Sequence, residues 1–249
     1  MEKQKRIIIN IHIPKTAGST LNSILNNQFK SEEKMDYYSG DYKKFIEKVN
    51  KNKDLKCING HFLFGLHNEI SEPYSYVTML RQPIDRVIST YYYIKRTPEH
   101  PIYNRVKKMS IGEFINTKDT HANYLVSNMQ TTYISGKYPP DLEEAKNNLL
   151  QHFDLVGITE MFDKSIFLMK KTFKWIDVNY KSMNVTNNRP SINQHSKDII
   201  DLIKAKNQMD LELYEFGEFI FNQKIKNLDI KTQKELKGFL DYKNEDNTV

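Results

Sequence analysis

The stretch from Ile7 to Leu21 reads IIINIHIPKTAGSTL, in which a short β-branched run is followed at once by a cation, hydroxyls and a glycine. The apolar part, Ile7 to Ile13, is typical of a buried strand in a parallel sheet. Pro14 ends this strand because it has no N–H group to donate to a neighbouring strand. A helix is expected to begin near Gly18. The stretch therefore predicts a strand, a short loop and a helix, the repeating unit of an α/β fold.

The loop between this strand and this helix predicts an anion-binding site. Backbone N–H groups at a helix start point into the crevice beyond the strand, and the helix dipole favours negative charge there. Lysine and hydroxyl side chains add donors, so phosphate or sulfate is the expected occupant. A β-to-α turn with an incidental lysine is the alternative for this motif alone. The residues expected to hold the anion are Lys15, Thr16, Ala17, Gly18, Ser19 and Thr20.

The order of lysine and glycine in the loop limits the kind of anion. A Walker A loop, G-x-x-x-x-G-K-[ST], places its glycines ahead of the lysine so that a long backbone loop wraps a triphosphate. Here Lys15 precedes Gly18, and no glycine lies between Ile7 and Lys15. The loop is therefore too short to wrap a polyphosphate and suits one terminal anionic group.

A second strand-to-helix junction lies at residues 76 to 93, which read YVTMLRQPIDRVISTYYY. Arg81 leaves the end of the apolar strand, and Pro83 suits the first turn of a helix whose buried positions recur at helical spacing. Ser89 lies two turns from Arg81 on the strand-facing side. Because a guanidinium group matches phosphate oxygens, Arg81 and Ser89 predict a second phosphate site. A surface salt bridge is the alternative for Arg81 alone.

Taken together, these motifs resemble the carbohydrate sulfotransferase family typified by heparan sulfate 2-O-sulfotransferase. The resemblance extends over about residues 6 to 225, and the combination of motifs is more specific than any one of them. It implies that the sulfuryl donor is 3'-phosphoadenosine 5'-phosphosulfate (PAPS). The segments that carry the resemblance are Ile13–Leu21, Gly60–His61, Leu80–Ser89, Ala145–Glu160 and Asn184–Pro190.

The resemblance also implies how the donor is held. The loop that begins at Lys15 would hold the 5'-phosphosulfate, and Arg81 with Ser89 would hold the 3'-phosphate. Arg189, in a later loop, would close over the nucleotide, unless it is an exposed loop arginine without such a role. We expect no metal, because lysine, arginine and helix N–H groups supply the positive charge that magnesium supplies in kinases.

The reaction implied is in-line transfer of a sulfuryl group to an acceptor hydroxyl, in which positioning and charge stabilisation do most of the work. Lys15 would neutralise the charge that grows on the leaving phosphate oxygen. The hydroxyl needs a base, for which histidine is suited at neutral pH. His61 is the first candidate because it follows a short strand that would open into the same crevice, and His67 is a second candidate for base or substrate contact. Asn59 stands where some members of the family carry a further histidine, and His12 is expected to be packed inside the first strand.

The acceptor implied by the resemblance is a carbohydrate or glycoconjugate. Residues 95 to 108 predict a basic loop in which Lys95 and Arg96 would form part of an acceptor-binding wall, with a solvated loop as the alternative. The net charge of +6 suits a polyanionic donor, although a lysine-rich surface is the commoner reason for so small an excess. Nucleic acid is not an expected partner, because the basic residues are dispersed and no helix-turn-helix, zinc-finger or ribonucleoprotein signature is present.

Composition predicts one enzyme domain over residues 1–249, with a core at about residues 6–225 and a helical or polar tail over residues 226–249. A chain of 249 residues with 39% hydrophobic content can bury a sizeable core. The single cysteine, Cys57, excludes an internal disulfide. No apolar run is long enough to span a membrane and no signal peptide is recognised, so we expect a cytoplasmic, bacterial enzyme.

The expected fold is a three-layer α/β/α domain with a P-loop-like parallel sheet, acting as a sulfotransferase. Two other functions are carried as alternatives. A nucleotide-dependent phosphotransferase or kinase would have a Walker A loop and a magnesium-binding acidic strand end, and the first of these is absent. A catalytically silent nucleotide-binding module would keep the anion sites and lose the base. Asn59, in place of the further histidine of some family members, is compatible with this alternative.

Overall fold

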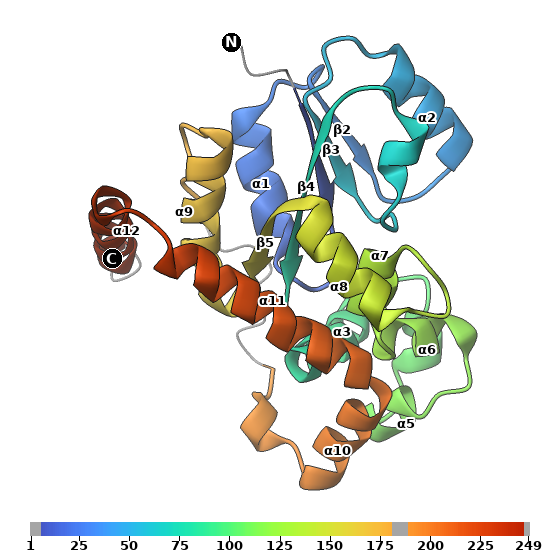
Figure 1. Ribbon diagram of the computed structural model, residues 1–249. Coiled ribbons are helices and arrows are strands. Elements are labelled where there is room, and N and C mark those ends of the chain that lie inside the picture. Colours follow the sequence, from blue (N-terminus) through green and yellow to red (C-terminus); the bar gives the residue numbers. More distant parts are fainter. Residues whose placement is uncertain (1–5, 181–188, 247–249) are drawn as a thin grey trace.

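The structure, a computed structural model, describes residues 6–180 and 189–246. A sheet of five parallel strands lies at its centre in the order β2-β3-β1-β4-β5, flanked by helices (Figure 1). This arrangement confirms the predicted three-layer α/β/α fold with a parallel sheet. The strands are β1 (Ile7–Ile11), β2 (Lys34–Tyr37), β3 (Cys57–Gly60), β4 (Tyr74–Leu80) and β5 (Phe153–Ile158).

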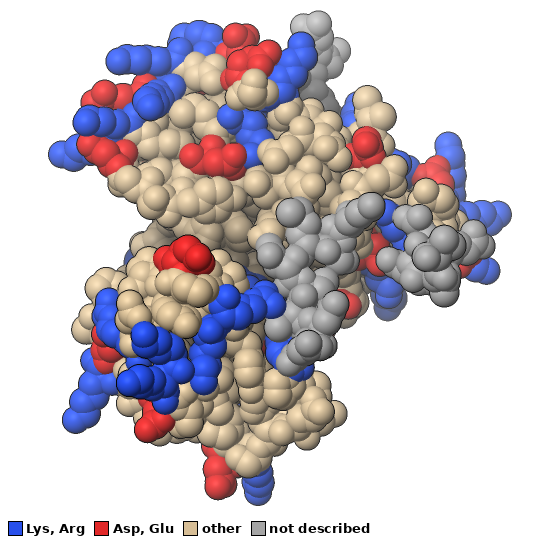
Figure 2. All heavy atoms as spheres, turned by 180° about the vertical axis from the view of Figure 1, so that it is seen from behind, with Lys and Arg blue, Asp and Glu red and all other residues tan. Residues whose placement is uncertain are grey.

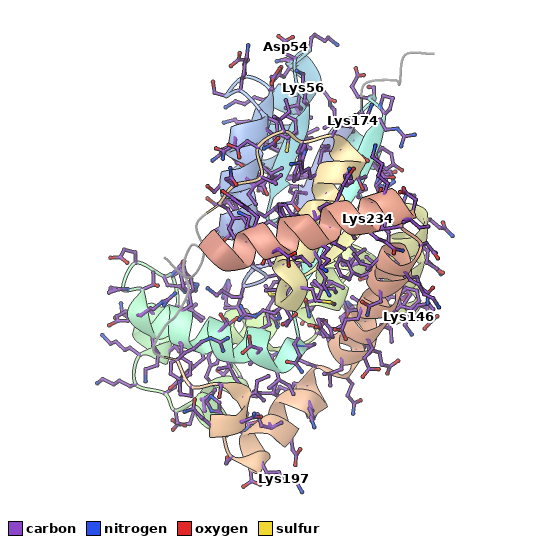
Figure 3. The ribbon with its side chains drawn as sticks, turned by 90° about the vertical axis from the view of Figure 1, so that its left-hand side faces the viewer. Asp54, Lys56, Lys146, Lys174, Lys197 and Lys234 are labelled. Carbon is purple, nitrogen blue, oxygen red and sulfur yellow. The ribbon has the colours of Figure 1, made fainter. Side chains whose placement is uncertain are left out.

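Helices cover both faces of the sheet. In Figure 1, α1 and α9 lie on one side of the strands, and α2 and α8 lie on the other. The long helix α11 packs against β5, and α12, which carries Lys234, lies across the outside of α9 (Figure 3). These helices are α1 (Gly18–Gln28), α2 (Tyr42–Lys51), α8 (Leu142–Gln151), α9 (Phe162–Phe173), α11 (Gln208–Lys226) and α12 (Ile230–Asp246).

The remaining helices form a helical part below the carboxyl edge of the sheet in Figure 1. Most of them share a second cluster of buried apolar side chains, separate from the cluster around the sheet. They are α3 (Pro83–Arg96), α4 (Tyr103–Val106), α5 (Ile111–Ile115), α6 (Thr120–Val126), α7 (Met129–Ser135) and α10 (Lys197–Lys206). Short 3-10 turns, η1 (Leu66–Glu69), η2 (Thr159–Met161) and η3 (Ile192–Gln194), lie between elements.

The register of the sheet explains why chemistry-bearing residues meet at one edge. β1 is the middle strand, and every one of its residues is buried, as expected for a strand covered on both faces. Ile11 pairs with Gly60 of β3 on one side and with Thr78 of β4 on the other. Because all three strands run in the same direction, the residues that follow them leave from the same edge of the sheet.

The boundaries predicted from the sequence are largely confirmed. Helices begin at Gly18 and Pro83 as expected, although β1 ends at Ile11 rather than Ile13. The prediction of a basic loop over residues 95–108 is wrong in part. Lys95 and Arg96 belong to the last turn of α3, and α4 forms a helical turn farther along, because Ile94, Ile102 and Val106 are buried in the second apolar cluster and anchor the segment.

Within residues 6–180 and 189–246, no helix combines the length and the apolar character needed to cross a lipid bilayer.

Candidate active site

A cleft of about 990 Å³ opens at the carboxyl edge of the sheet. Figure 2 shows a deep hollow between the upper and lower parts of the molecule, with lysine and arginine side chains gathered on its lower side. The cleft is lined by residues from the β1–α1 loop, the end of β3 and the β4–α3 junction. Those that the sequence singled out are Lys15, Ala17, Gly18, Ser19, Thr20, His61, Arg81, Ser89 and Arg189.

The β1–α1 loop presents backbone donors to this cleft. Lys15 and Ala17 have φ angles of 71° and 63°, a left-handed conformation that non-glycine residues rarely adopt. Two such residues cost on the order of 1–3 kcal/mol each, which the surrounding fold must offset. Within the described chain, the N–H groups of residues 17–19 donate to no protein acceptor, whereas those of Thr20 and Leu21 donate to the Ala17 carbonyl at 3.1 Å. The loop is therefore a ready anion site at the start of an eleven-residue helix.

Thr16 contributes to this loop differently from the prediction. Its hydroxyl donates to the Ile13 carbonyl at 2.8 Å, and the residue is 1% exposed. The hydroxyl thus fixes the turn rather than facing the cleft. Ser19 and Thr20 do line the cleft.

His12 lies beside this loop, just beyond the end of β1, and lines the cleft. It packs directly on Gly18, where an added Cβ would lie 1.8 Å from His12 Nε2. Glycine at position 18 is therefore required by the imidazole ring. Burial, helped by the charges of His61 and Lys15, lowers the pKa of His12 to about 3. The expectation that His12 is packed inside the first strand is wrong in its place: β1 ends at Ile11, and His12 is half-buried at the cleft.

The Lys15 ammonium group rests on an aromatic ring. Its Nζ lies 4.0 Å from the centroid of Tyr93, a residue of α3, which is close enough for a cation–π interaction. Burial lowers the pKa of Lys15 to about 8, and the charges of Arg81, Arg96 and Arg189 add to the effect. No carboxylate of the described residues pairs with this ammonium group.

Arg81 forms the centre of the second predicted anion site. Its Nη1 donates to the Ser89 hydroxyl at 3.3 Å and to the Lys15 carbonyl at 2.8 Å. The two predicted anion sites therefore adjoin. Its Nε and Nη2 both donate to Asp85 Oδ2, at 2.9 and 2.5 Å.

Arg189 joins the same group from a distant part of the chain. Its Nη2 donates to Asp85 Oδ2 at 2.7 Å, and its Nη1 lies 2.6 Å from Asp85 Oδ1. Burial would raise the pKa of Asp85, but hydrogen bonds and charge from Arg189 and Arg81 outweigh it and lower this pKa. Asp85 holds two guanidinium groups side by side. Residues 184–188 of the predicted covering loop lie outside the described residues.

His61 follows β3 and faces the cleft from the other side. Its ring centroid lies 4.5 Å from that of His12 and 4.9 Å from that of Tyr38. Burial lowers the pKa of His61 to about 4, so the ring is neutral at pH 7 and able to accept a proton.

Asn59 belongs to a polar network that extends from buried Asn10 to the exposed residues Asp36 and Tyr38. Its Oδ1 accepts from Asn10 Nδ2 at 2.7 Å, and its Nδ2 donates to the Tyr38 hydroxyl at 2.8 Å and to Asp36 Oδ1 at 2.5 Å. Asn59 therefore supports Tyr38, which lines the cleft, and is itself fully buried.

His67, Lys95 and Arg96 are not among the residues that line the cleft. His67 Nδ1 lies 3.1 Å from the Tyr76 hydroxyl in a cluster of aromatic rings, because the chain turns at Gly65, with φ of 119°, into η1. Lys95 and Arg96 are exposed on the last turn of α3. The Arg96 guanidinium lies 5.9 Å from the Tyr93 centroid and so flanks the Lys15 site, whereas Lys95 Nζ lies 3.2 Å from the Tyr91 hydroxyl.

Sequence reasoning missed several contributors. Asp85 had a signal, since it is a carboxylate four residues after Arg81, in the first turn of the helix that follows it. For Tyr93 and Tyr38, the sequence gives no signal of a role at the site beyond their position near the motifs. In the part of the chain that the structure describes, no group of three or more His, Cys, Asp or Glu side chains is arranged to hold a metal ion.

The chain is similar to known proteins in sequence. A family model described as the sulfotransferase family matches residues 1–217. The chain is 23% identical to Heparan-sulfate 6-O-sulfotransferase 3-B of Danio rerio, over 88% of this chain and 64% of that protein. It is 25% identical to the Heparin sulfate O-sulfotransferase of Drosophila melanogaster, over 72% of this chain and 59% of that protein. The chain therefore spans less than two thirds of the length of these relatives.

Solved structures of two sulfotransferases are also similar. The mouse sulfotransferase SULT7A1, complexed with PAP (3'-phosphoadenosine 5'-phosphate), aligns with a TM-score of 0.48 and 14% identity over 88% of this chain and 90% of that one. A sulfotransferase from Alicyclobacillus acidocaldarius aligns with a TM-score of 0.49 and 12% identity over 86% and 95% of the two chains.

Proposed function

From the premise that this chain belongs to the sulfotransferase family, we propose that it transfers a sulfuryl group from PAPS to a hydroxyl of a carbohydrate or glycoconjugate. The observation that carries the proposal is that two adjoining anion sites and a neutral histidine line one cleft. PAPS has an anionic group at each end of its ribose, so two such sites suit it better than a single phosphate site would. The relatives in the comparison are named for heparan sulfate or heparin sulfate, which motivates a carbohydrate acceptor.

The first site would bind the 5'-phosphosulfate. Three backbone N–H groups without protein acceptors and the Lys15 ammonium supply its donors. Arg81, Ser89 and Arg189 would bind the 3'-phosphate, with Asp85 keeping the two guanidinium groups in place. These residues fit a nucleotide with two anionic groups, because both sites line one cleft and supply backbone N–H, ammonium or guanidinium groups.

His61 would act as the general base. The acceptor hydroxyl would give its proton to the His61 ring as the new O–S bond forms and the bond from sulfur to the bridging phosphate oxygen breaks. Lys15 would stabilise the charge on that phosphate oxygen, and the products would be the sulfate ester and 3'-phosphoadenosine 5'-phosphate (PAP). A bound polyanion would raise the pKa of His61 from about 4 toward neutrality, which improves its match to the task.

The acceptor would approach along the basic lower side of the cleft. Residues 95–108 carry five exposed cations and one exposed carboxylate, Glu99, and one of these cations, Arg96, lies beside Tyr93. Lys95 and Arg96 belong to this surface, which suits an acidic acceptor such as a sulfated or uronate-containing sugar. The exposed cations are Lys95, Arg96, Arg105, Lys107 and Lys108.

The first experiment is isothermal titration of the protein with PAP and with ATP, each with EDTA present. We expect PAP to bind more tightly than ATP and EDTA to leave PAP binding unchanged, because lysine and arginine side chains supply the positive charge. Tighter binding of ATP, or loss of PAP binding on chelation, would favour a phosphotransferase instead.

Turnover of PAPS on a panel of sugars then separates an enzyme from a silent binding module. We expect sulfated product with at least one anionic oligosaccharide, measured by transfer of label from the donor. Tight PAP binding without turnover on any acceptor in the panel would support the silent module. A single domain over residues 1–249, a cytoplasmic location and a bacterial source stay predictions from the sequence.

A further inference from the structure

The backbone of Arg81 lies just beyond the sheet and depends on a side chain for its hydrogen bonds. β4 ends at Leu80, whose partner Ile158 is the last paired residue of β5. The next residue along, Arg81, has an N–H and a C=O group past the end of that ladder. Backbone groups this close to a protein interior need partners, because a buried N–H or C=O group left unpaired loses its hydrogen bonds to water without replacement.

Both groups are bonded by one side chain, that of Gln130 on α7. The Arg81 N–H donates to Gln130 Oε1 at 2.9 Å, and Gln130 Nε2 donates to the Arg81 carbonyl at 2.8 Å. Gln130 is fully buried. Its amide therefore continues the hydrogen bonding of the sheet by one residue, at the point where Arg81 turns its guanidinium into the cleft.

The start of α7 is itself fixed by a buried carboxylate on α11. Asp210 accepts from the backbone N–H groups of Gln130 and Thr131, at 3.1 and 2.7 Å, and from the Thr131 hydroxyl at 2.8 Å. Asp210 is fully buried, so its position is set by packing. Asp210 thus fixes the backbone at Gln130, and the Gln130 side chain in turn fixes the backbone of Arg81.

We propose that Gln130 is a positioning residue for the Arg81 guanidinium, setting the direction in which that group meets the 3'-phosphate of the nucleotide. The inference rests on the proposed function for the identity of that phosphate. Gln130 touches neither the cleft nor the guanidinium group, so it acts only through the backbone of Arg81. A small rotation at the Arg81 backbone is enlarged along its long side chain and would misalign the contacts to Ser89 and the Lys15 carbonyl.

The test compares two nucleotides that differ by the 3'-phosphate, PAP and adenosine 5'-phosphate. In Gln130→Met the side chain keeps its approximate volume and loses both hydrogen bonds. We expect the dissociation constant for PAP to rise about tenfold or more, the size of one charge-assisted contact, and that for adenosine 5'-phosphate to change less than twofold. Should Gln130→Met fail to fold, Gln130→Glu, which keeps the acceptor and loses the donor, is measured with the same expectation.

Asn148→Leu is the matched control. Asn148 is buried, and its amide donates to the Ile134 carbonyl at 3.0 Å, so this variant also removes a buried amide-to-backbone bond on α8. It should leave the ratio of the two dissociation constants unchanged. Adding Gln130→Met to Arg81→Ala should weaken PAP binding no further, because the group that Gln130 positions is already gone.

Three outcomes would overturn these statements, and they are distinguishable. Equal weakening of both nucleotides by Gln130→Met would make Gln130 a general structural residue. Unchanged PAP binding in a folded variant would show that Arg81 needs no such support. Equal binding of the two nucleotides by the unsubstituted protein would instead remove the proposed 3'-phosphate site and with it the proposed function.

Discussion

The two proposed anion sites of the cleft are built in opposite ways. The β1–α1 loop offers backbone N–H groups and one ammonium group that no described carboxylate contacts. The Arg81 site instead has two guanidinium groups already bonded to Asp85. A site whose cation is held only by an aromatic ring can respond when charge changes during a reaction. A site whose cations are fixed by a carboxylate holds a constant charge in a constant place, which suits binding.

The physical basis of the difference is the cost of reorganisation. Lys15 has a single charge on a flexible chain, a lowered pKa, and a cation–π contact of about 0.5–2 kcal/mol that it must give up on reaching an anion. Arginine keeps its charge at all accessible pH values, and its planar fork loses less freedom per hydrogen bond. We therefore expect the Lys15 site to contribute mainly to turnover and the Arg81 site mainly to nucleotide affinity.

The largest effect is expected for Lys15→Ala. Loss of the ammonium group should reduce turnover by a factor of about 100 to 1,000, because its contact strengthens as charge develops on the leaving oxygen. PAP affinity should change by a few-fold only, since the backbone N–H groups remain. Steady-state kinetics and titration with PAP give the two numbers. A larger effect on affinity than on turnover would break the comparison.

His61→Ala is expected to lower turnover by about a hundredfold and to leave PAP affinity near that of the unsubstituted protein. The proposed base acts in the reaction step, so its loss should lower turnover more than affinity, as the loss of Lys15 should. His67→Ala is the control, because His67 lies in the Tyr76 cluster away from the cleft. A nearly active His61→Ala beside an inactive His67→Ala would transfer the base to His67.

Arg81→Ala is expected to raise the PAP dissociation constant about 10- to 150-fold, the equivalent of one lost charge-assisted contact. Turnover at saturating donor should fall by much less. Ser89→Ala removes a neutral hydroxyl and should cost about 2- to 10-fold in affinity. If both variants lowered turnover as strongly as Lys15→Ala at saturating donor, the division between affinity and turnover would be wrong.

We expect the change of kcat/KM with pH to be smaller than the effects of these substitutions. The proposed mechanism needs neutral His61 and protonated Lys15, so kcat/KM should rise with pH through about 4 and fall again above about 8. The limb at pH 8 should move upward in the profile of kcat, because bound anions stabilise the charged lysine. Lys15→Arg, which stays protonated, should lose this limb. Its persistence in that variant would assign it to another group.

The fold and the site residues Lys15, Arg81 and His61 could be predicted because each of these residues closely follows its strand in the sequence. Ile7 to Ile13 and Tyr76 to Leu80 are apolar runs that end in Lys15 and Arg81, so strand, turn and functional side chain are read together. His61 follows from the same rule at the end of β3. These residues meet because parallel strands present their carboxyl ends at one edge.

The residues that support these site residues could not be predicted, because their contacts join distant parts of the chain. Gln130 lies 49 residues from Arg81, and Arg189 lies 104 residues from Asp85. Nothing in the local pattern distinguishes Gln130 from other polar residues at a helix start. The Thr16 hydroxyl was misjudged for a related reason, since a side chain near an anion site can equally bond its own backbone.

The lowered pKa of Lys15 also gives the chain a distinctive nucleophile. Because burial lowers its pKa to about 8, more of this amine is uncharged at pH 7 than of an ordinary lysine. Aldehydes and activated esters of modest size should therefore modify Lys15 ahead of an unperturbed surface lysine. A covalent inhibitor that carries an anionic group beside such a warhead would combine recognition by the helix N–H groups with capture by the amine.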